Sequence, residues 1–273
     1  MPRLARITVY PIKSLDGVVV ENATIVGAGG LQHDRRFALR DVDGNFVNGK
    51  RHARIHLVRA VFDLAALQVT LSASDRAAGT FHLAAGNPAI EAWCSAFFGF
   101  PVNLEENTET GFPDDLESPG PTLIGTPTLQ EVAGWFDGVN LIEARRRFRA
   151  NLEIDSLSDN ADAVPGDCPP FWEDRLFAAD AAPDARQTVT FHIGGATFEG
   201  VNPCARCVVP SRDSQTGDVS PRFAVDFARR RRDSLPAWAE LKAFNHFYRL
   251  SLNTRATAAV GRTLRVGDEV HIG

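Results

Sequence analysis

Two cysteines three residues apart are the chemically most distinctive pair in the sequence. Cys204 and Cys207 lie in the stretch V-N-P-C-A-R-C-V-V-P. A structural zinc site needs four ligands, usually from a second close pair, but Cys94 and Cys168 are far apart. A thioredoxin-like site needs a cysteine at a helix N-terminus, whereas residues 207–210 predict a strand. Two buried structural thiols are the third interpretation.

Arg206 favours a metal-binding role for Cys207 over a buried, inert thiol. An adjacent cation stabilises the thiolate, which is the form of cysteine that binds metals. A single exposed thiolate is a soft ligand, suited to a metal whose other ligands come from elsewhere. The cysteine pair alone leaves these interpretations open.

Three further stretches carry side chains that suit an anionic ligand. In R-R-R-F-R-A-N-L, Arg149 and Asn151 lie two apart on a predicted strand, so both would point to one face. A guanidinium and an amide there would suit an oxyanion, and a solvated basic helix end is the alternative. Lys13 and Ser14 follow the first predicted strand in P-I-K-S, and Arg35 lies in D-R-R-F.

Short strands dominate the elements that should position these residues. Hydrophobic alternation predicts strands at 4–10, 18–26, 36–42, 55–63, 67–71, 80–83, 187–193, 196–201, 207–210, 248–253 and 269–272. Capping and stop signals predict helices at 88–98, 127–136, 140–147 and 236–246. The pattern predicts a mainly β protein with some α-helix (α+β), built as two β-barrel-like sub-domains rather than a doubly wound parallel sheet.

A stretch rich in proline and glycine, from Gly111 to Pro127, is the expected boundary between the two units. We therefore expect one unit in residues 1–112 and a second in residues 113–273.

Charge and composition narrow the classes of partner. The net charge of −5 argues against a dedicated nucleic-acid binder. No apolar run approaches the roughly 18 residues that span a membrane. The N-terminal M-P-R-L-A-R-I-T-V-Y enters a strand pattern directly and leaves no room for a signal peptide. With few and scattered cysteines, a cytoplasmic location is expected.

Taken in order, these stretches resemble the MOSC family, named after the C-terminal domain of molybdenum cofactor sulfurase. The sequence is most similar to the two-part form found in the mitochondrial amidoxime reducing component and its bacterial relatives. The resemblance assigns residues 1–112 to a MOSC N-terminal β-barrel domain and 113–273 to a MOSC domain. It rests on Y-P-I-K-S at 10–14, D-R-R-F with D-G-N at 34–45, R-F-R-A-N-L at 147–152, P-C-A-R-C with D-S-Q-T-G at 203–217, and V-G-D-E-V at 266–270.

The resemblance implies a molybdenum cofactor (molybdopterin with its metal) and a set of residues that hold it. Cys207 would be the catalytic residue and the protein ligand of the molybdenum, with Cys204 as a neighbour. Cationic, amide and helix N-terminal donors suit the phosphate and pterin. The cofactor-binding residues that it implies are Lys13, Ser14, Arg35, Lys50, Thr128, Arg149, Asn151 and Arg206.

The chain departs from the family pattern in places. Lys50 stands where relatives often have arginine, which keeps the charge but loses bidentate contact. Ala150 replaces the proline of R-F-R-P-N. No cysteine-rich, ferredoxin-like segment follows, so the resemblance implies a separate electron donor, ferredoxin-like or cytochrome b5-like with its reductase.

The implied activity is molybdenum-dependent reduction of small N-hydroxylated compounds, such as amidoximes, hydroxylamines and N-hydroxylated bases. The alternative is a cofactor carrier or sulfur-transfer module that uses a persulfide on Cys207. A structural two-barrel adaptor is a third interpretation, and it gives Cys207 and the arginines no role.

Overall fold

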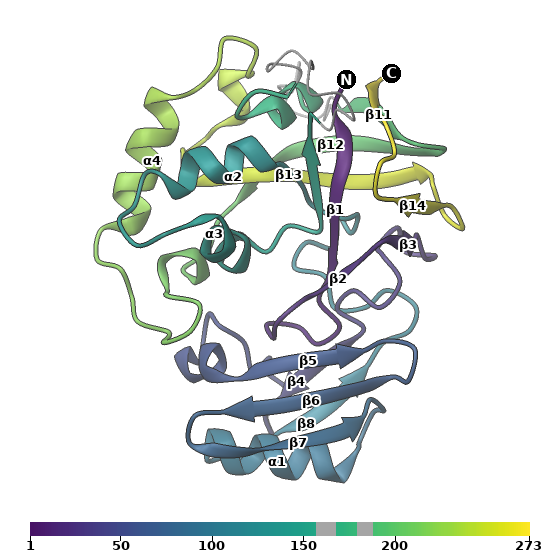
Figure 1. Cartoon of the computed structure of the whole chain (residues 1–273), viewed down its shortest axis with the longest axis vertical. Coiled ribbons are helices and arrows are strands. Elements are labelled where there is room, and N and C mark those ends of the chain that lie inside the picture. Colours follow the sequence, from purple (N-terminus) through teal and green to yellow (C-terminus); the bar gives the residue numbers. More distant parts are fainter. Residues whose placement is uncertain (157–167, 179–187) are drawn as a thin grey trace.

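Two lobes are stacked along the long axis of the molecule (Figure 1). The computed structural model describes residues 1–156, 168–178 and 188–273. We call the part formed by residues 37–106 the small lobe and the rest of the described chain the large lobe.

The small lobe is an antiparallel β structure with one helix on it. Its strands are β4 (Phe37–Arg40), β5 (Arg59–Asp63), β6 (Gln68–Ala73), β7 (Arg76–His82) and β8 (Asn103–Glu106). The ladders are β5-β6-β7 and β4-β8. Helix α1 (Pro88–Phe98) has the bounds predicted from sequence, because its ends are fixed locally. Asn87 caps it by accepting from the Ala89 amide, and Gly99 ends it with a φ of 81°.

The large lobe is built on one mixed sheet with the strand order β15-β11-β12-β13-β9-β10-β1-β2. Neighbouring strands are antiparallel except for β9 and β10, which are parallel. A separate ladder joins β3 to β14. The strands are β1 (Arg3–Val9), β2 (Val18–Val20), β3 (Asn22–Thr24), β9 (Leu123–Gly125), β10 (Leu152–Asp155), β11 (Val189–Ile193), β12 (Ala196–Ala205), β13 (Arg249–Ala258), β14 (Thr263–Arg265) and β15 (Val270–Ile272).

The large sheet curls back toward its own first strand. The Leu4 amide donates to Asp268 O at 2.8 Å, and the Val270 amide donates to Pro2 O at 2.9 Å. These bonds join β1 to the segment that leads into β15, although the two strands are far apart in the strand order. The predicted class, mainly β with some helix, is confirmed. Within the described residues the sheets are open and curled rather than closed barrels.

Three α-helices cover one side of the large lobe, on the left in Figure 1. They are α2 (Thr126–Ala133), α3 (Leu141–Phe148) and α4 (Phe223–Asp233). Aromatic side chains hold them together: Phe227 lies 5.3 Å from Trp135 and 5.8 Å from Phe148, measured between ring centroids. In the part of the chain that the structure describes, no helix combines the length and apolar character needed to cross a bilayer.

Some predicted elements are absent or different. The 207–210 strand was wrong: the chain turns into a short 3₁₀ helix, η3 (Val209–Ser211), because both the amide and the hydroxyl of Ser211 donate to Val208 O. The 236–246 helix is reduced to η4 (Leu241–Ala243). Residue 187, where another strand was expected to begin, lies outside the described residues.

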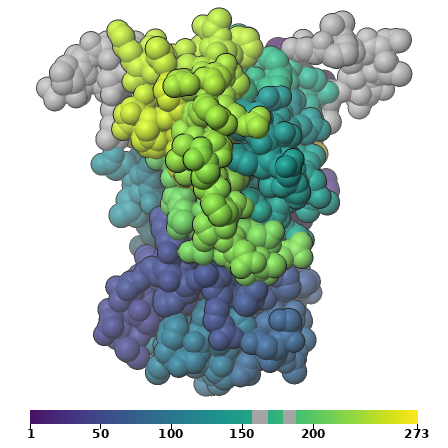
Figure 2. Space-filling view, turned by 90° about the vertical axis from the view of Figure 1, so that its left-hand side faces the viewer, coloured from purple at the N-terminus to yellow at the C-terminus, as the bar shows by residue number. Residues whose placement is uncertain are grey.

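Several contacts join the two lobes near the site, among them the hydrogen bond from the Lys13 amide to Phe37 O. Figure 2 shows the segment after β12 descending from the large lobe onto the small one. There Arg59 donates to Ser214 O at 3.1 Å, close to the 3₁₀ helix η1 (Ala53–Leu57). The loop that follows β8 leads back into the large lobe, where the Phe112 amide donates to Arg35 O and the Gly120 amide to Thr254 O. This loop contains the predicted boundary at residues 112 and 113, which stays a prediction. Strands β1–β3 precede it yet pair within the large lobe.

Candidate functional site

Cationic side chains gather around one carboxylate where the lobes meet. Lys13 Nζ donates to Asp114 Oδ1 at 2.7 Å and to Phe112 O at 2.9 Å. Arg35 Nη2 lies 3.6 Å from the second oxygen, Asp114 Oδ2. Arg149 is close enough for the charges of Arg35 and Asp114 to affect its pKa, which burial lowers. The structure therefore brings together three of the residues expected to bind the cofactor.

The backbone of this cluster is unusual for residues with side chains. Ser14, Arg35 and Arg149 have φ values of 72°, 48° and 53°, in the left-handed region that favours glycine. Such conformations cost free energy and tend to concentrate at ligand sites. Local bonds hold them here: the Arg35 amide donates to Tyr10 O, and the Arg149 amide donates to Arg145 O.

Arg149 does not lie on a strand as predicted. Helix α3 ends at Phe148, and Arg149 turns the chain out of it in the left-handed conformation. Its guanidinium lies 4.1 Å from the centre of the Tyr10 ring and donates to Leu15 O at 2.7 Å. Because β10 starts only at Leu152, Arg149 and Asn151 do not share the face of one strand.

Asn151 is committed to holding strands together. Its side chain is buried and donates to Thr8 O at 3.2 Å. Its carbonyl oxygen accepts from both the amide and the hydroxyl of Thr122, each at 3.2 Å. The amide group thus links the segments that lead into β9 and β10 to β1. These contacts use it as a structural bridge and not as a group facing a ligand.

Thr128 also departs from its expected role. The side chain is fully buried in α2, where its hydroxyl donates to Glu173 Oε2 at 2.9 Å. The Thr128 hydroxyl oxygen also accepts from the Phe171 amide at 2.6 Å. A hydroxyl with both functions occupied and no exposed surface has no room for a phosphate, so we leave Thr128 out of the site.

Electrostatics keep the cluster charged. Burial raises the pKa of the Asp114 carboxyl, but Arg35 and Lys13 outweigh that effect and hold it well below its usual range. Burial lowers the pKa of Lys13, and the Asp114 carboxylate offsets part of this shift. Lys50 is exposed, and its charge acts on both groups. The site is therefore an ion cluster at neutral pH.

The cysteine pair lies at the end of β12. Cys204 is inside the strand, Cys207 follows it, and both are partly buried. Cys94 and Cys168 belong to two different hydrophobic cores, so the cysteines do not converge on one site.

Arg206, which was expected to act on Cys207, contacts Cys204. Its guanidinium lies 3.3 Å from Cys204 Sγ and also donates to Phe148 O and Leu250 O. The expectation that it stabilises a thiolate at Cys207 stays a prediction. It fixes the backbone from which Cys207 extends.

The cysteine segment faces the cation cluster. The pKa of Arg35 is raised although burial, the largest effect, lowers it. The charges of Asp34 and Asp114 raise this pKa, and Cys204 adds a smaller effect in the same direction. A Cβ on Gly49, beside Lys50, would lie 3.1 Å from Val209. The predicted metal ligand and the predicted phosphate contacts thus approach the same junction.

Two polar atoms near this junction were not singled out by sequence reasoning. The Tyr248 hydroxyl is buried and has no hydrogen-bond partner among the described residues. Its pKa is raised, chiefly by burial, and the charges of Arg206 and Cys207 also act on it. His56 Nε2 is likewise buried without a partner in the described chain, and burial followed by Arg149 lowers the His56 pKa to about 4. Neither residue belongs to a motif, so only the fold reveals them.

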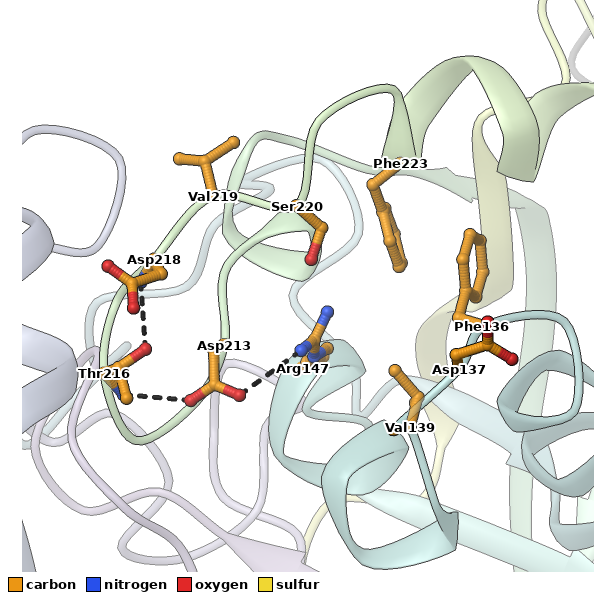
Figure 3. A pocket seen from close by; sticks show the side chains of 11 residues that line it. Phe136, Asp137, Val139, Arg147, Asp213, Thr216, Asp218, Val219, Ser220 and Phe223 are labelled. Carbon is orange, nitrogen blue, oxygen red and sulfur yellow. Dashed lines mark hydrogen bonds and ion pairs between the residues drawn. The ribbon is translucent and has the colours of Figure 1, made fainter.

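A pocket of about 490 Å³ opens on the large lobe beside this region (Figure 3). Phe136 and Phe223, stacked with centroids 4.2 Å apart, form one wall. Arg147 lies between this wall and Asp213: its guanidinium is 5.7 Å from the centre of the Phe223 ring and 3.6 Å from Asp213, and its Nε donates to Glu143 at 2.6 Å. The pocket is thus lined by aromatic rings and by Arg147, whose charge is already paired with the carboxylates of Asp213 and Glu143.

The donor set fits an anionic cofactor whose metal binds a thiolate. The large lobe offers three cations, the charge of Lys50 reaches them from the small lobe, and the partly exposed Cys207 lies on the segment that approaches this junction. Arg35, Lys13, Lys50, Arg149 and Cys207 fit this role, whereas Asn151 and Thr128 are occupied elsewhere.

Comparison with known families gives two matches along the chain. Residues 1–104 match the MOSC N-terminal beta barrel domain, and residues 131–271 match the MOSC domain. No curated protein matches the chain. Together the two matches span both lobes and place the chain in the MOSC family, which is associated with molybdenum cofactor binding.

Proposed function

We propose that this protein holds a molybdenum cofactor at the junction of its lobes and reduces small N-hydroxylated compounds with electrons from a separate redox protein. The observation that carries the proposal is the pair of cations, Lys13 and Arg35, on the Asp114 carboxylate, with Arg149 close enough for the charges of Arg35 and Asp114 to affect its pKa. Ion clusters of this kind are suited to a phosphate-bearing ligand.

Each residue has a physical role in this proposal. Lys13 and Arg35 bind the phosphate, since both are held in place before a ligand arrives. Arg149 stacks on Tyr10 and contributes positive charge from the large lobe. Lys50 adds charge from the solvent side. The Cys207 thiolate is the protein ligand of the molybdenum.

Reduction of an N–OH group consumes two electrons and two protons and yields an N–H group and water. When bound, the molybdenum cofactor would supply the two-electron couple that this reaction requires. The chain contributes binding, orientation and partial exclusion of water. Arg206 fixes the end of β12 through Phe148 O and Leu250 O, which positions Cys207. We propose that a separate protein, ferredoxin-like or cytochrome b5-like, supplies the electrons.

Metal analysis and turnover test the proposal together. The full chain is expressed in a host that makes the cofactor, and molybdenum per chain is measured beside benzamidoxime reduction with a chemical reductant. We expect about one molybdenum per chain and measurable turnover. Molybdenum without turnover would favour the carrier function, and absence of molybdenum would overturn the proposal.

The two cysteines provide a matched pair of variants. Cys207→Ala is expected to abolish turnover and release the metal while the circular dichroism spectrum stays unchanged. Cys204→Ala removes only the sulfur that contacts Arg206, and we expect a much milder effect. Equal losses in both variants would contradict the assignment of Cys207 as the ligand.

A further inference from the structure

We propose that Asp114 is an internal occupant of the anion site, and that its carboxylate leaves Lys13 and Arg35 when the phosphate of a ligand enters. The inference rests on the proposed function, because it takes these two cations as the phosphate site.

The contacts show one carboxylate using both cations at once. Asp114 Oδ1 accepts from Lys13 Nζ at 2.7 Å, and Oδ2 lies 3.6 Å from Arg35 Nη2. A carboxylate between an ammonium and a guanidinium has the charge and spacing that a phosphate oxygen pair would have. The position that a ligand needs is therefore filled by the chain's own anion.

Exposure differs sharply between the carboxylate and its partners. The Asp114 side chain is 54% exposed, whereas the side chains of Lys13 and Arg35 are 8% and 15% exposed. Asp114 thus reaches two buried cations from the solvent side. Rotation of its side chain would carry the carboxylate into water, where an ion is well solvated, while the cations stay in place.

The loop that carries Asp114 is anchored on either side of it. The Phe112 amide donates to Arg35 O, and the Gly120 amide donates to Thr254 O. Gly111 has a φ of 63°, and a Cβ there would lie 3.1 Å from Arg35 O. These anchors hold the backbone against Arg35 at one end and against β13 at the other. The carboxylate can leave without breaking either of them.

Charge makes the exchange necessary. Arg35 and Lys13 keep Asp114 ionised across the neutral range, so it does not neutralise itself by taking up a proton. A phosphate bound to the same cations would lie within a few ångströms of this carboxylate. Two anions at about 4 Å repel by roughly 1 kcal/mol even in water and more when partly buried. Displacement of Asp114 removes this repulsion.

Phosphate binding to the full chain, purified without the cofactor, tests the exchange. Inorganic phosphate is titrated at constant ionic strength and followed by calorimetry and ³¹P NMR. Asp114→Asn keeps the side-chain shape but removes the charge, and we expect it to bind phosphate about fivefold more tightly than the wild type, or better. Glu109→Gln makes the same charge change at an exposed position of the same loop, and should leave the affinity unchanged.

The outcomes separate this inference from the function on which it rests. Equal affinity in the wild type and Asp114→Asn would overturn the exchange while leaving the phosphate site intact. A gain in both Asp114→Asn and Glu109→Gln would reduce the effect to net charge and would also overturn it. Absence of phosphate binding in every variant would reject Lys13 and Arg35 as the site. Lys13→Gln, with its fold checked by circular dichroism, should lose binding in the Asp114→Asn background.

Discussion

Asn151 offers the sharpest test of which residues hold the fold and which face the ligand. Asn151→Ala removes a buried side chain that donates to Thr8 O and accepts twice from Thr122. The buried Thr8 O and the partly buried Thr122 amide then lack these partners. An unsatisfied buried group costs about 1–3 kcal/mol, so the loss should total about 3 kcal/mol.

Urea denaturation of the chain without cofactor measures this loss directly. A decrease of about 3 kcal/mol corresponds to a fall in Tm of about 6–12 °C for a protein of this size. Thr122→Val removes one of the two bonds at the Asn151 oxygen and serves as the graded comparison, for which we expect about half the effect. If Asn151→Ala leaves the unfolding free energy within about 0.5 kcal/mol but prevents retention of molybdenum, the structural assignment is refuted and Asn151 is a cofactor contact.

Two further predictions concern stability. Burial raises the pKa of the Glu173 carboxyl to about 7, so between pH 4.5 and 7 the folded state holds a proton that the unfolded state has released. The unfolding free energy should therefore fall as pH rises through this range, by up to about 3 kcal/mol, and Glu173→Gln should lose most of that dependence in denaturation at a series of pH values. Unchanged pH profiles would show that Glu173 titrates normally. Gly200→Ala would place a Cβ 1.7 Å from Leu176 O, a clash with backbone that should cost about 3 kcal/mol in the same assay. Gly195→Ala in the β11–β12 turn adds its methyl group to open space and is the matched control; similar losses in both would contradict the steric explanation.

Local signals account for what the sequence predicted well. Asn87, Pro88 and Gly99 mark both ends of α1 within the local sequence. Helix α4 has no such signals: Arg222 precedes it in the left-handed conformation without a side-chain cap. Phe223 and Phe227 pack this helix against Trp135, Phe136 and Phe148, which lie far away in the sequence. The helix was therefore missed.

The sequence indicated which side chains could form the site but not how the fold would arrange them. Lys13 and Arg35 share the Asp114 carboxylate, whereas Arg149 comes near them by ending a helix rather than by lying on a strand. Asp114 carries no motif, and its role depends on a loop folding back over both cations. Arg206 gives a second example: it is adjacent to Cys207 in the sequence, but its guanidinium contacts Cys204 Sγ. The order of residues alone does not show which cysteine this side chain contacts.

Synthesis on the ribosome delivers β1 long before the strands that complete it. Its neighbour β10 emerges only after the whole small lobe, at an interval on the order of 10 s for translation at about 5–20 residues per second. The bonds from Leu4 and Pro2 to residues 268 and 270 form later still. The small lobe, whose strands are contiguous in the chain, can pair during that wait, so it would be the first part of the nascent protein to acquire its shape. The half of the junction that contains Cys207 would assemble against a partner already in place.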